Sequence, residues 1–145
     1  VLVKNDDIIG YCDMYPVTTE AYEELVSGKV IIRDSMIDLF CMGGTFDVYI
    51  SMIGIIPQEA TQSNYLKVFD WIFKHLQEWK QSDINANRIG ISVYSDMLEK
   101  FVKMFGFEYK CLNPAKGKVY ETSIEKLKLN TQIQKRYPMF VNEGE

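Results

Sequence analysis

Paired cysteines and clustered histidines are missing from this sequence. Its three cysteines, Cys12, Cys41 and Cys111, lie far apart with no CxxC pair, and His75 is the single histidine. A structural zinc site takes four such ligands at short spacings, so the sequence predicts no metal site. An odd number of scattered cysteines is typical of reduced thiols that pack as small hydrophobic side chains, and we expect a cytoplasmic protein. His75 falls within a helical pattern, where a packed side chain is a better interpretation than a catalytic base.

Long apolar runs are also missing. The longest, from Met52 to Pro57, is interrupted by Gly54, whereas a membrane-spanning helix needs about 20 apolar residues. No basic segment followed by an apolar one opens the chain, so no secretory signal is visible. We therefore expect neither a membrane span nor a membrane partner.

The sequence also lacks an excess of basic residues. The formal net charge is −4, and nucleic-acid binding needs a concentrated basic face, so no nucleic-acid partner is expected. The charge is unevenly distributed: residues 1–59 hold ten acidic and three basic side chains, and residues 60–145 hold ten acidic and thirteen basic ones. This asymmetry fits an uneven solvated surface, and it also leaves open an acidic part that faces a cationic ligand and a basic part that faces an anionic one.

The local signatures of common hydrolases, kinases and nucleotide-binding enzymes are absent as well. The chain has no GxSxG, no GxxxxGK[ST], no GxGxxG after a strand and no HExxH. What is present is a mixed pattern of strands and helices in a chain whose length suits one domain, so we expect residues 1–145 to form a single α/β domain.

The expected elements follow from hydrophobic periodicity and from turn and cap residues. In chain order they are a hairpin of Val1–Val3 with Ile8–Tyr15 closed by Pro16, a short helix from Thr18 or Thr19 to Leu25, a loosely extended segment over Val30–Phe40, a strand over Phe46–Ile56, a long helix over Ser63–Lys80, a strand over Arg88–Tyr94, a helix from Ser95 or Asp96 to Phe105, and strands over Phe107–Leu112 and Val119–Ile124.

Three stretches of this pattern resemble the GCN5-related N-acetyltransferase (GNAT) superfamily. They are Asp7–Tyr11, which is similar to the family's third strand; Ile53–Pro57 with the long helix behind it; and Ile91–Cys111, which contains the pair Gly106-Phe107 at a helix end. The resemblance implies a mixed sheet, mostly antiparallel, in which one parallel pair of strands splays apart and helices cover both faces. Little or nothing before Val1 corresponds to the family's first strand and first two helices. We expect either that these elements are missing from this sequence or that another segment, such as Thr18–Phe40 or Glu125–Phe140, takes their place.

The resemblance also implies a co-substrate, acetyl-CoA, and a direct attack of an amine on its thioester in a ternary complex. The acceptor is then a small-molecule or protein amine. In this family the pantetheine arm pairs with the backbone of one splayed strand, and the pyrophosphate rests on amides at the start of the long helix, where oriented N–H groups bind anions. On this basis the residues facing pantetheine are Ile53, Gly54, Ile55 and Ile56, and those of the pyrophosphate loop are Thr61, Gln62, Ser63, Asn64 and Tyr65.

The sequence departs from the family pattern at both functional positions. Ala60, Ser63 and Tyr65 stand where the loop usually has Arg or Gln and two small residues, so the ring of Tyr65 would crowd a phosphate unless it turns into the core. Val102 stands where the family often has a tyrosine that protonates the departing thiolate. The substitutes are Tyr94 or Ser95 as the proton or hydrogen-bond donor and Asp47 as the base, with Glu20 or Asp34 acting through water as further alternatives.

Two functional hypotheses from different classes follow. The first is an acetyl-CoA-dependent N-acetyltransferase, which can work without a dedicated acid because orientation and backbone polarisation carry much of the catalysis. The second is a degenerate, non-catalytic member whose splayed gap is filled and which serves as a binding or interaction module. An unrelated α/β domain with an unsplayed sheet is a third reading. The segment Glu125–Phe140 is interpreted as a solvated tail, or as a contact that covers a strand edge or joins a homodimer.

Overall fold

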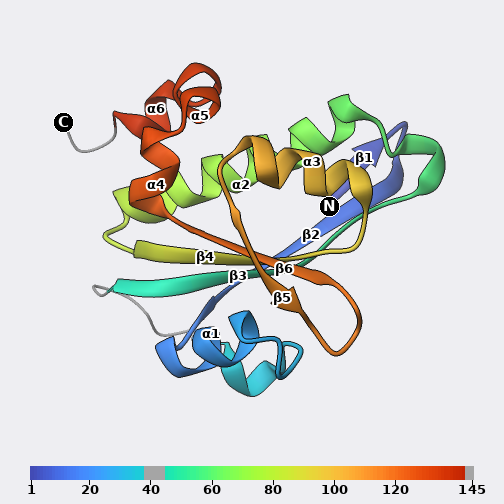
Figure 1. Cartoon of the computed structure of the whole chain (residues 1–145). Coiled ribbons are helices and arrows are strands. Elements are labelled where there is room, and N and C mark those ends of the chain that lie inside the picture. Colours follow the sequence, from blue (N-terminus) through green and yellow to red (C-terminus); the bar gives the residue numbers. More distant parts are fainter. Residues whose placement is uncertain (38–44, 143–145) are drawn as a thin grey trace.

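One mixed sheet forms the centre of the structure, which is a computed structural model describing residues 1–37 and 45–142 (Figure 1). Within these residues the sheet has six strands in the order β1-β2-β3-β4-β6-β5, and only β3 and β4 pair in parallel. The strands are β1 (Leu2–Lys4), β2 (Asp7–Val17), β3 (Thr45–Ile55), β4 (Asn85–Val93), β5 (Glu108–Leu112) and β6 (Lys118–Ser123). A mostly antiparallel sheet with one parallel pair is the predicted fold class.

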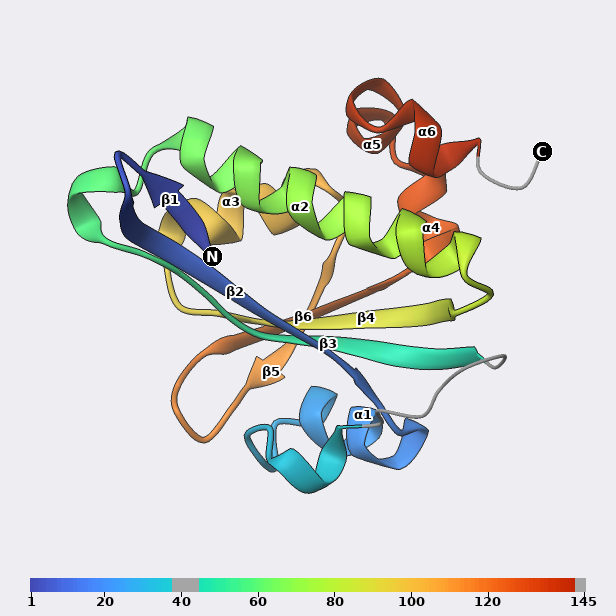
Figure 2. The same ribbon diagram turned by 180° about the vertical axis from the view of Figure 1, so that it is seen from behind.

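Helices cover both faces of this sheet, as predicted. Helices α2 (Gln62–Gln81) and α3 (Asp96–Met104) lie on one face, and α1 (Thr19–Val26) lies on the other (Figures 1 and 2). A hydroxyl side chain caps the start of each helix: Thr61 for α2, Ser95 for α3 and Thr18 for α1. Each hydroxyl accepts the backbone N–H three residues further on, which would otherwise be left without a partner at a helix start. No helix in the described ranges is long and apolar enough to cross a membrane.

Two details of the N-terminal part correct the sequence analysis. Strand β2 continues through Pro16 to Val17, because β1 pairs only with Asp7–Gly10 and, among the described residues, no strand pairs with that edge of β2 at the proline. The segment from Val30 is not extended over its length: a 3₁₀ turn (η1, Asp34–Met36) interrupts it before the bridge from Val17 to Ile37. Residues 38–40 of the predicted segment lie outside the described residues.

The C-terminal segment is part of the core and not a solvated tail. It forms α4 (Ile124–Leu129), α5 (Thr131–Arg136) and α6 (Pro138–Val141), which pack beside the far end of α2. Leu127, Ile133 and Phe140 are buried. The ring of Tyr137 stacks on Phe73 of α2 at 4.3 Å, so this segment covers the end of the α2 face of the sheet, while α1 covers the opposite face.

Candidate functional site

A β-bulge in β3 makes the two parallel strands part. Strand β2 pairs Asp13 with Met52 and Met14 with Ile50, so Ser51 is an extra residue on β3. Pairing between β3 and β4 stops at Ile50 and Ile91, although β3 continues to Ile55 and β4 to Val93. A bulge bends its strand and increases the local twist, which directs the second half of β3 away from β4. The splayed pair is therefore present where the resemblance placed it.

The residues predicted to face pantetheine lie on this diverging half of β3. The side chain of Ile53 is buried in the core under α2 and α3, Ile55 packs at the edge of that core, and Ile56 is exposed. Gly54 lies against the Tyr11 ring, which would be 2.9 Å from a Cβ at this position. Beyond Ile50, the edge of β3 on the side of β4 makes no further pairs with that strand.

The start of α2 leaves two backbone donors available. The Asn64 N–H donates to the Thr61 hydroxyl at 3.2 Å, and the Tyr65 N–H donates to the Thr61 carbonyl. The N–H groups of Gln62 and Ser63 have no acceptor within the described ranges, and both residues are exposed. Two free amides at the positive end of a 20-residue helix form a suitable place for an anion.

Charged side chains beside this helix start were not anticipated from the sequence. A hollow of about 320 Å³ is lined by Lys4, Glu59, Thr61, Ser63 and Lys67, among others. Lys4 Nζ lies 2.9 and 3.1 Å from the two carboxylate oxygens of Glu59. The hydrogen bond from Lys4 lowers the pKa of Glu59 below its usual value, so a carboxylate already lies beside the two lysines.

Tyr65 and Ser95, both predicted site residues, are brought together. The Tyr65 ring is 3% exposed and stacks on Phe101 at 6.1 Å. Its hydroxyl lies 3.1 Å from the Ser95 hydroxyl, which also accepts the Leu98 N–H as the cap of α3. Because the ring turns into the core, it does not cover the start of α2.

Tyr94 points away from the gap. Its ring lies over Gly117 of the β5–β6 turn, where a Cβ would come within 2.5 Å of it. Its hydroxyl oxygen accepts a hydrogen bond from Asn113 Nδ2 at 2.9 Å, on the side of β4 that borders β6. Tyr94 and Ser95 are therefore neighbours in the chain whose side chains lie in different surroundings.

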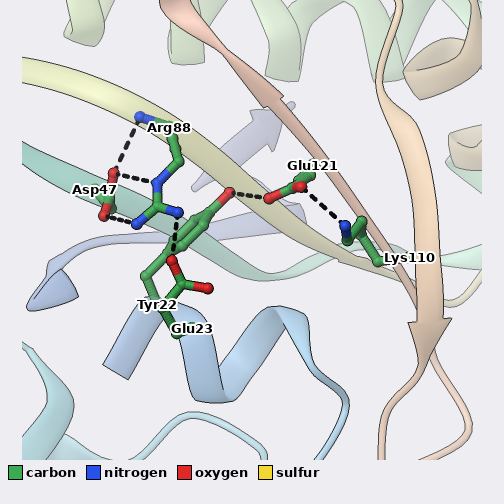
Figure 3. A network of polar contacts seen from close by, with 6 residues as sticks. All are labelled: Tyr22, Glu23, Asp47, Arg88, Lys110 and Glu121. Atoms are coloured by element: carbon green, nitrogen blue, oxygen red, sulfur yellow. Dashed lines mark hydrogen bonds and ion pairs between the residues drawn. The ribbon is translucent and has the colours of Figure 1, made fainter. Parts of the chain in front are cut away.

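Asp47 lies in the paired half of β3 and is held in an ion pair (Figure 3). Its carboxylate accepts the Arg88 N–H at 3.2 Å, Nε at 3.1 Å and Nη2 at 2.8 Å. Arg88 also contacts Glu23 and lies 4.4 Å from the centre of the Tyr22 ring. Asp47 is not brought together with Ser95 or Tyr65, and the alternatives Glu20 and Asp34 are exposed on the α1 side.

A buried hydroxyl pair between β3 and β4 was missed by the sequence analysis. The Tyr49 hydroxyl lies 2.6 Å from that of Ser92, just past the last β3–β4 pair, and burial raises the pKa of Tyr49 to about 12. The Tyr49 ring lies over Gly90, its partner in the register. A Cβ at position 90 would be only 2.8 Å from the ring. The sequence signal that could have predicted this pair is Gly90-x-Ser92 on one strand and Tyr49 on the strand beside it.

Glu99 of α3 accepts hydrogen bonds from two side chains of β6. Tyr120 Oη donates to it at 2.6 Å and Lys118 Nζ at 3.1 Å, and these bonds lower the pKa of Glu99 below its usual value. A lowered folded-state pKa gives stability that is present above the unfolded value and lost as the pH falls through the folded one. In urea titrations, acidification from neutral pH is expected to destabilise the parent more than Glu99→Gln. Equal losses in the two proteins would contradict this role.

Comparison with known proteins gives a match to solved structures. The chain has a GNAT-like fold. It is similar to a structure of Arabidopsis thaliana NAA60 in complex with acetyl-CoA, at 16% identity over 83% of this chain and 68% of the other, with a TM-score of 0.52. It is similar also to a bacterial toxin, at 14% identity over 84% of this chain and 63% of the toxin, with a TM-score of 0.53. No protein-family model and no curated protein sequence matches the chain.

Proposed function

We propose that the protein is an acetyl-CoA-dependent N-acetyltransferase that transfers an acetyl group to the amine of a small molecule or a protein. The observation that carries the proposal is the parting of β3 from β4 beyond Ile50 and Ile91, beside a helix start with two free amides. The acetyl-CoA complex among the structurally similar proteins supports the choice of co-substrate.

In the proposed binding mode, most contacts with acetyl-CoA are made by backbone groups of the protein. The amide groups of the pantetheine arm pair with the unpaired edge of β3 that follows Ser51. The pyrophosphate lies at the start of α2, on the N–H groups of Gln62 and Ser63. Lys4 and Lys67, which line the hollow there, supply the positive charge that the family takes from an Arg at the position of Ala60.

The proposed reaction is a direct transfer. The amine nitrogen bonds to the thioester carbonyl carbon, the C–S bond breaks, the amine loses one proton to water, and the CoA thiolate takes up one proton from water. Ser95 remains the proposed hydrogen-bond donor to the sulfur because it lies at the end of β4 with Tyr65 beside it, and Tyr94 is the alternative. The amine proton leaves through water to Glu20 or Asp34, since Asp47 is occupied by Arg88.

A second candidate function is a non-catalytic binding module. The hydroxyl bond from Tyr65 to Ser95 and the ion pair from Lys4 to Glu59 favour it, because each uses groups that the co-substrate would need. The two functions are separated by an assay of thiol release from acetyl-CoA with amine acceptors, starting with polyamines and aminoglycoside-like cations. Amine-dependent release supports the transferase, and its absence across the screen, with folded protein, supports the module.

Glu59→Gln is expected to tighten acetyl-CoA binding by about three- to tenfold. The change removes a negative charge beside the phosphate position and frees Lys4. Lys4→Met should weaken binding instead, because Glu59 then lies unneutralised beside the phosphates. Affinities of both variants, measured at low and moderate salt, check the prediction, and the difference should shrink as salt screens it. A Glu59→Gln protein that binds more weakly than the parent would contradict the placement.

A further inference from the structure

A buried hydrogen-bond cluster lies on the α1 side of the sheet where β3 and β4 part. It joins Tyr49 of β3, Ser92 of β4 and Asn113 beside the β5–β6 turn, which are 2%, 3% and 6% exposed. The Tyr49 and Ser92 hydroxyl oxygens are 2.6 Å apart, and Asn113 Nδ2 lies 3.3 Å from the Ser92 oxygen. Solvent does not reach such a cluster freely, so each of its protons needs a defined acceptor.

The backbone of the β5–β6 turn fixes the orientation of the Asn113 amide. Its Oδ1 accepts the N–H of Ala115 at 3.0 Å and of Gly117 at 2.9 Å. The NH₂ group therefore faces Ser92 and Tyr94, with one proton for each. An NH₂ group only donates, so the Ser92 oxygen has to act as the acceptor in its contact with Asn113.

The Tyr49–Ser92 pair carries one more hydroxyl proton than its contacts use. Tyr49 and Ser92 carry one hydroxyl proton each, and a single contact between their oxygens uses one of them. If Ser92 donates, the Tyr49 proton is left over, and if Tyr49 donates, the Ser92 proton is left over. Among the described residues neither hydroxyl has a further acceptor. One buried O–H donor is thus free, just past the last β3–β4 pair at Ile50 and Ile91.

We propose that Asn113 is a positioning residue that leaves the Tyr49–Ser92 pair with one hydroxyl proton to donate to the carbonyl oxygen of a thioester between β3 and β4. This inference rests on the proposed function and adds a donor for the reacting carbonyl. When the amine bonds to the carbonyl carbon, the oxygen becomes an oxyanion, and the hydrogen bond to it strengthens. The hydroxyl proton stays on the pair as the C–S bond breaks and the carbonyl reforms.

Asn113→Asp tests the proton count with little change of shape. A carboxylate still accepts the N–H groups of Ala115 and Gly117, but it also accepts the Ser92 proton. Tyr49 then donates to Ser92, and no proton is left for the thioester. Loss of one oxyanion donor lowers kcat by about 10²–10³-fold, and we expect a fall of that order, whereas the KM for acetyl-CoA should rise only by the factor by which the parent prefers acetyl-CoA to CoA.

A second substitution should restore part of the activity. In the double variant Asn113→Asp, Ser92→Ala, Tyr49 has lost the acceptor for its proton and again has a proton to donate, so kcat should rise at least about tenfold above that of Asn113→Asp alone. If Asn113 only holds the β5–β6 turn, the double variant will be no faster than the single one, which would overturn the proposal. Should Asn113→Asp fail to fold, the double variant Tyr49→Phe, Ser92→Ala removes both protons with Asn113 in place and should show the same loss in kcat.

Measurements on the parent protein distinguish a failure of the Asn113 role from a failure of the proposed function. We expect it to bind acetyl-CoA more tightly than CoA, because only acetyl-CoA has the carbonyl oxygen, and we expect Asn113→Asp to lose this preference. A parent that turns over acetyl-CoA while Asn113→Asp keeps the parent kcat overturns the role of Asn113 and leaves the proposed function standing. A folded parent that binds neither ligand overturns both.

Discussion

Arg88→Ala is expected to lower the free energy of unfolding by about 3–5 kcal/mol, the range for removing one partner of a buried ion pair. The Asp47 side chain is only 4% exposed, and Arg88 supplies both the guanidinium and the backbone N–H that it accepts. Without the guanidinium, a buried carboxylate loses its countercharge. The Tyr22 ring of α1, which lies under the guanidinium in Figure 3, loses its contact too, so α1 is held less firmly on the sheet.

Glu23→Gln is the matched control for Arg88→Ala. Glu23 contacts the same guanidinium, but its side chain is 59% exposed. An exposed ion pair contributes about 0–1 kcal/mol, so this variant should unfold within that range of the parent. Urea denaturation of the three proteins, with unchanged m-values, gives the comparison. An Arg88→Ala protein as stable as Glu23→Gln would contradict the buried role of Asp47.

Deletion of Ser51 is expected to abolish acetyl-CoA binding while leaving the core under α2 largely in place. In the parent, Ile50 and Ile53 both lie in this core although they are three positions apart, because the bulge shifts the alternation of side chains on β3. Without Ser51 the two residues are two positions apart, so ordinary alternation keeps Ile53 and Ile55 on the same face. Strand β3 would lose the bend that directs its second half away from β4, and the two strands would stay paired beyond Ile50 and Ile91.

Ser51→Ala is the matched control for the deletion. It keeps the number of residues on β3, and therefore the bulge, while it removes the hydroxyl. We expect near-parental stability and parental acetyl-CoA affinity. Thermal unfolding and calorimetric titration of the parent, the deletion and Ser51→Ala make the test. A folded deletion variant that binds acetyl-CoA like the parent would show that the bulge does not part the strands.

Much of the fold could be predicted because local residue patterns decide it. The long helix was predicted within a residue or two of α2, since apolar positions such as Phe69, Ile72 and Leu76 recur at helical spacing and are buried. Asn5 and Asp6 give the first hairpin its turn, with φ of 51° and 66°, values that these residue types adopt more easily than most. Pro16 misled the prediction because a proline ends a strand only where the missing N–H is needed.

The candidate site was predicted in outline and missed in its tertiary contacts. The family resemblance implied the splay and helical spacing predicted α2, whereas Lys4 meets Glu59 across 55 positions of the chain. Asn113 reaches Ser92 through a turn, and no periodicity reports which way its amide points. The Tyr65 ring could be foreseen to enter the core, but its hydroxyl bond to Ser95 depends on how α2 and α3 pack. Contacts of this kind depend on the packed arrangement of distant elements.

The central claim is that the parted strands and the start of α2 bind acetyl-CoA. Calorimetric titration of the purified protein with acetyl-CoA, and separately with CoA, at low and moderate salt tests it most directly. We predict micromolar binding that weakens as salt rises, because the phosphates meet Lys4, Lys67 and the start of α2. Absence of binding to either ligand by folded protein at both salt concentrations would contradict the claim and leave an interaction module with a GNAT-like fold.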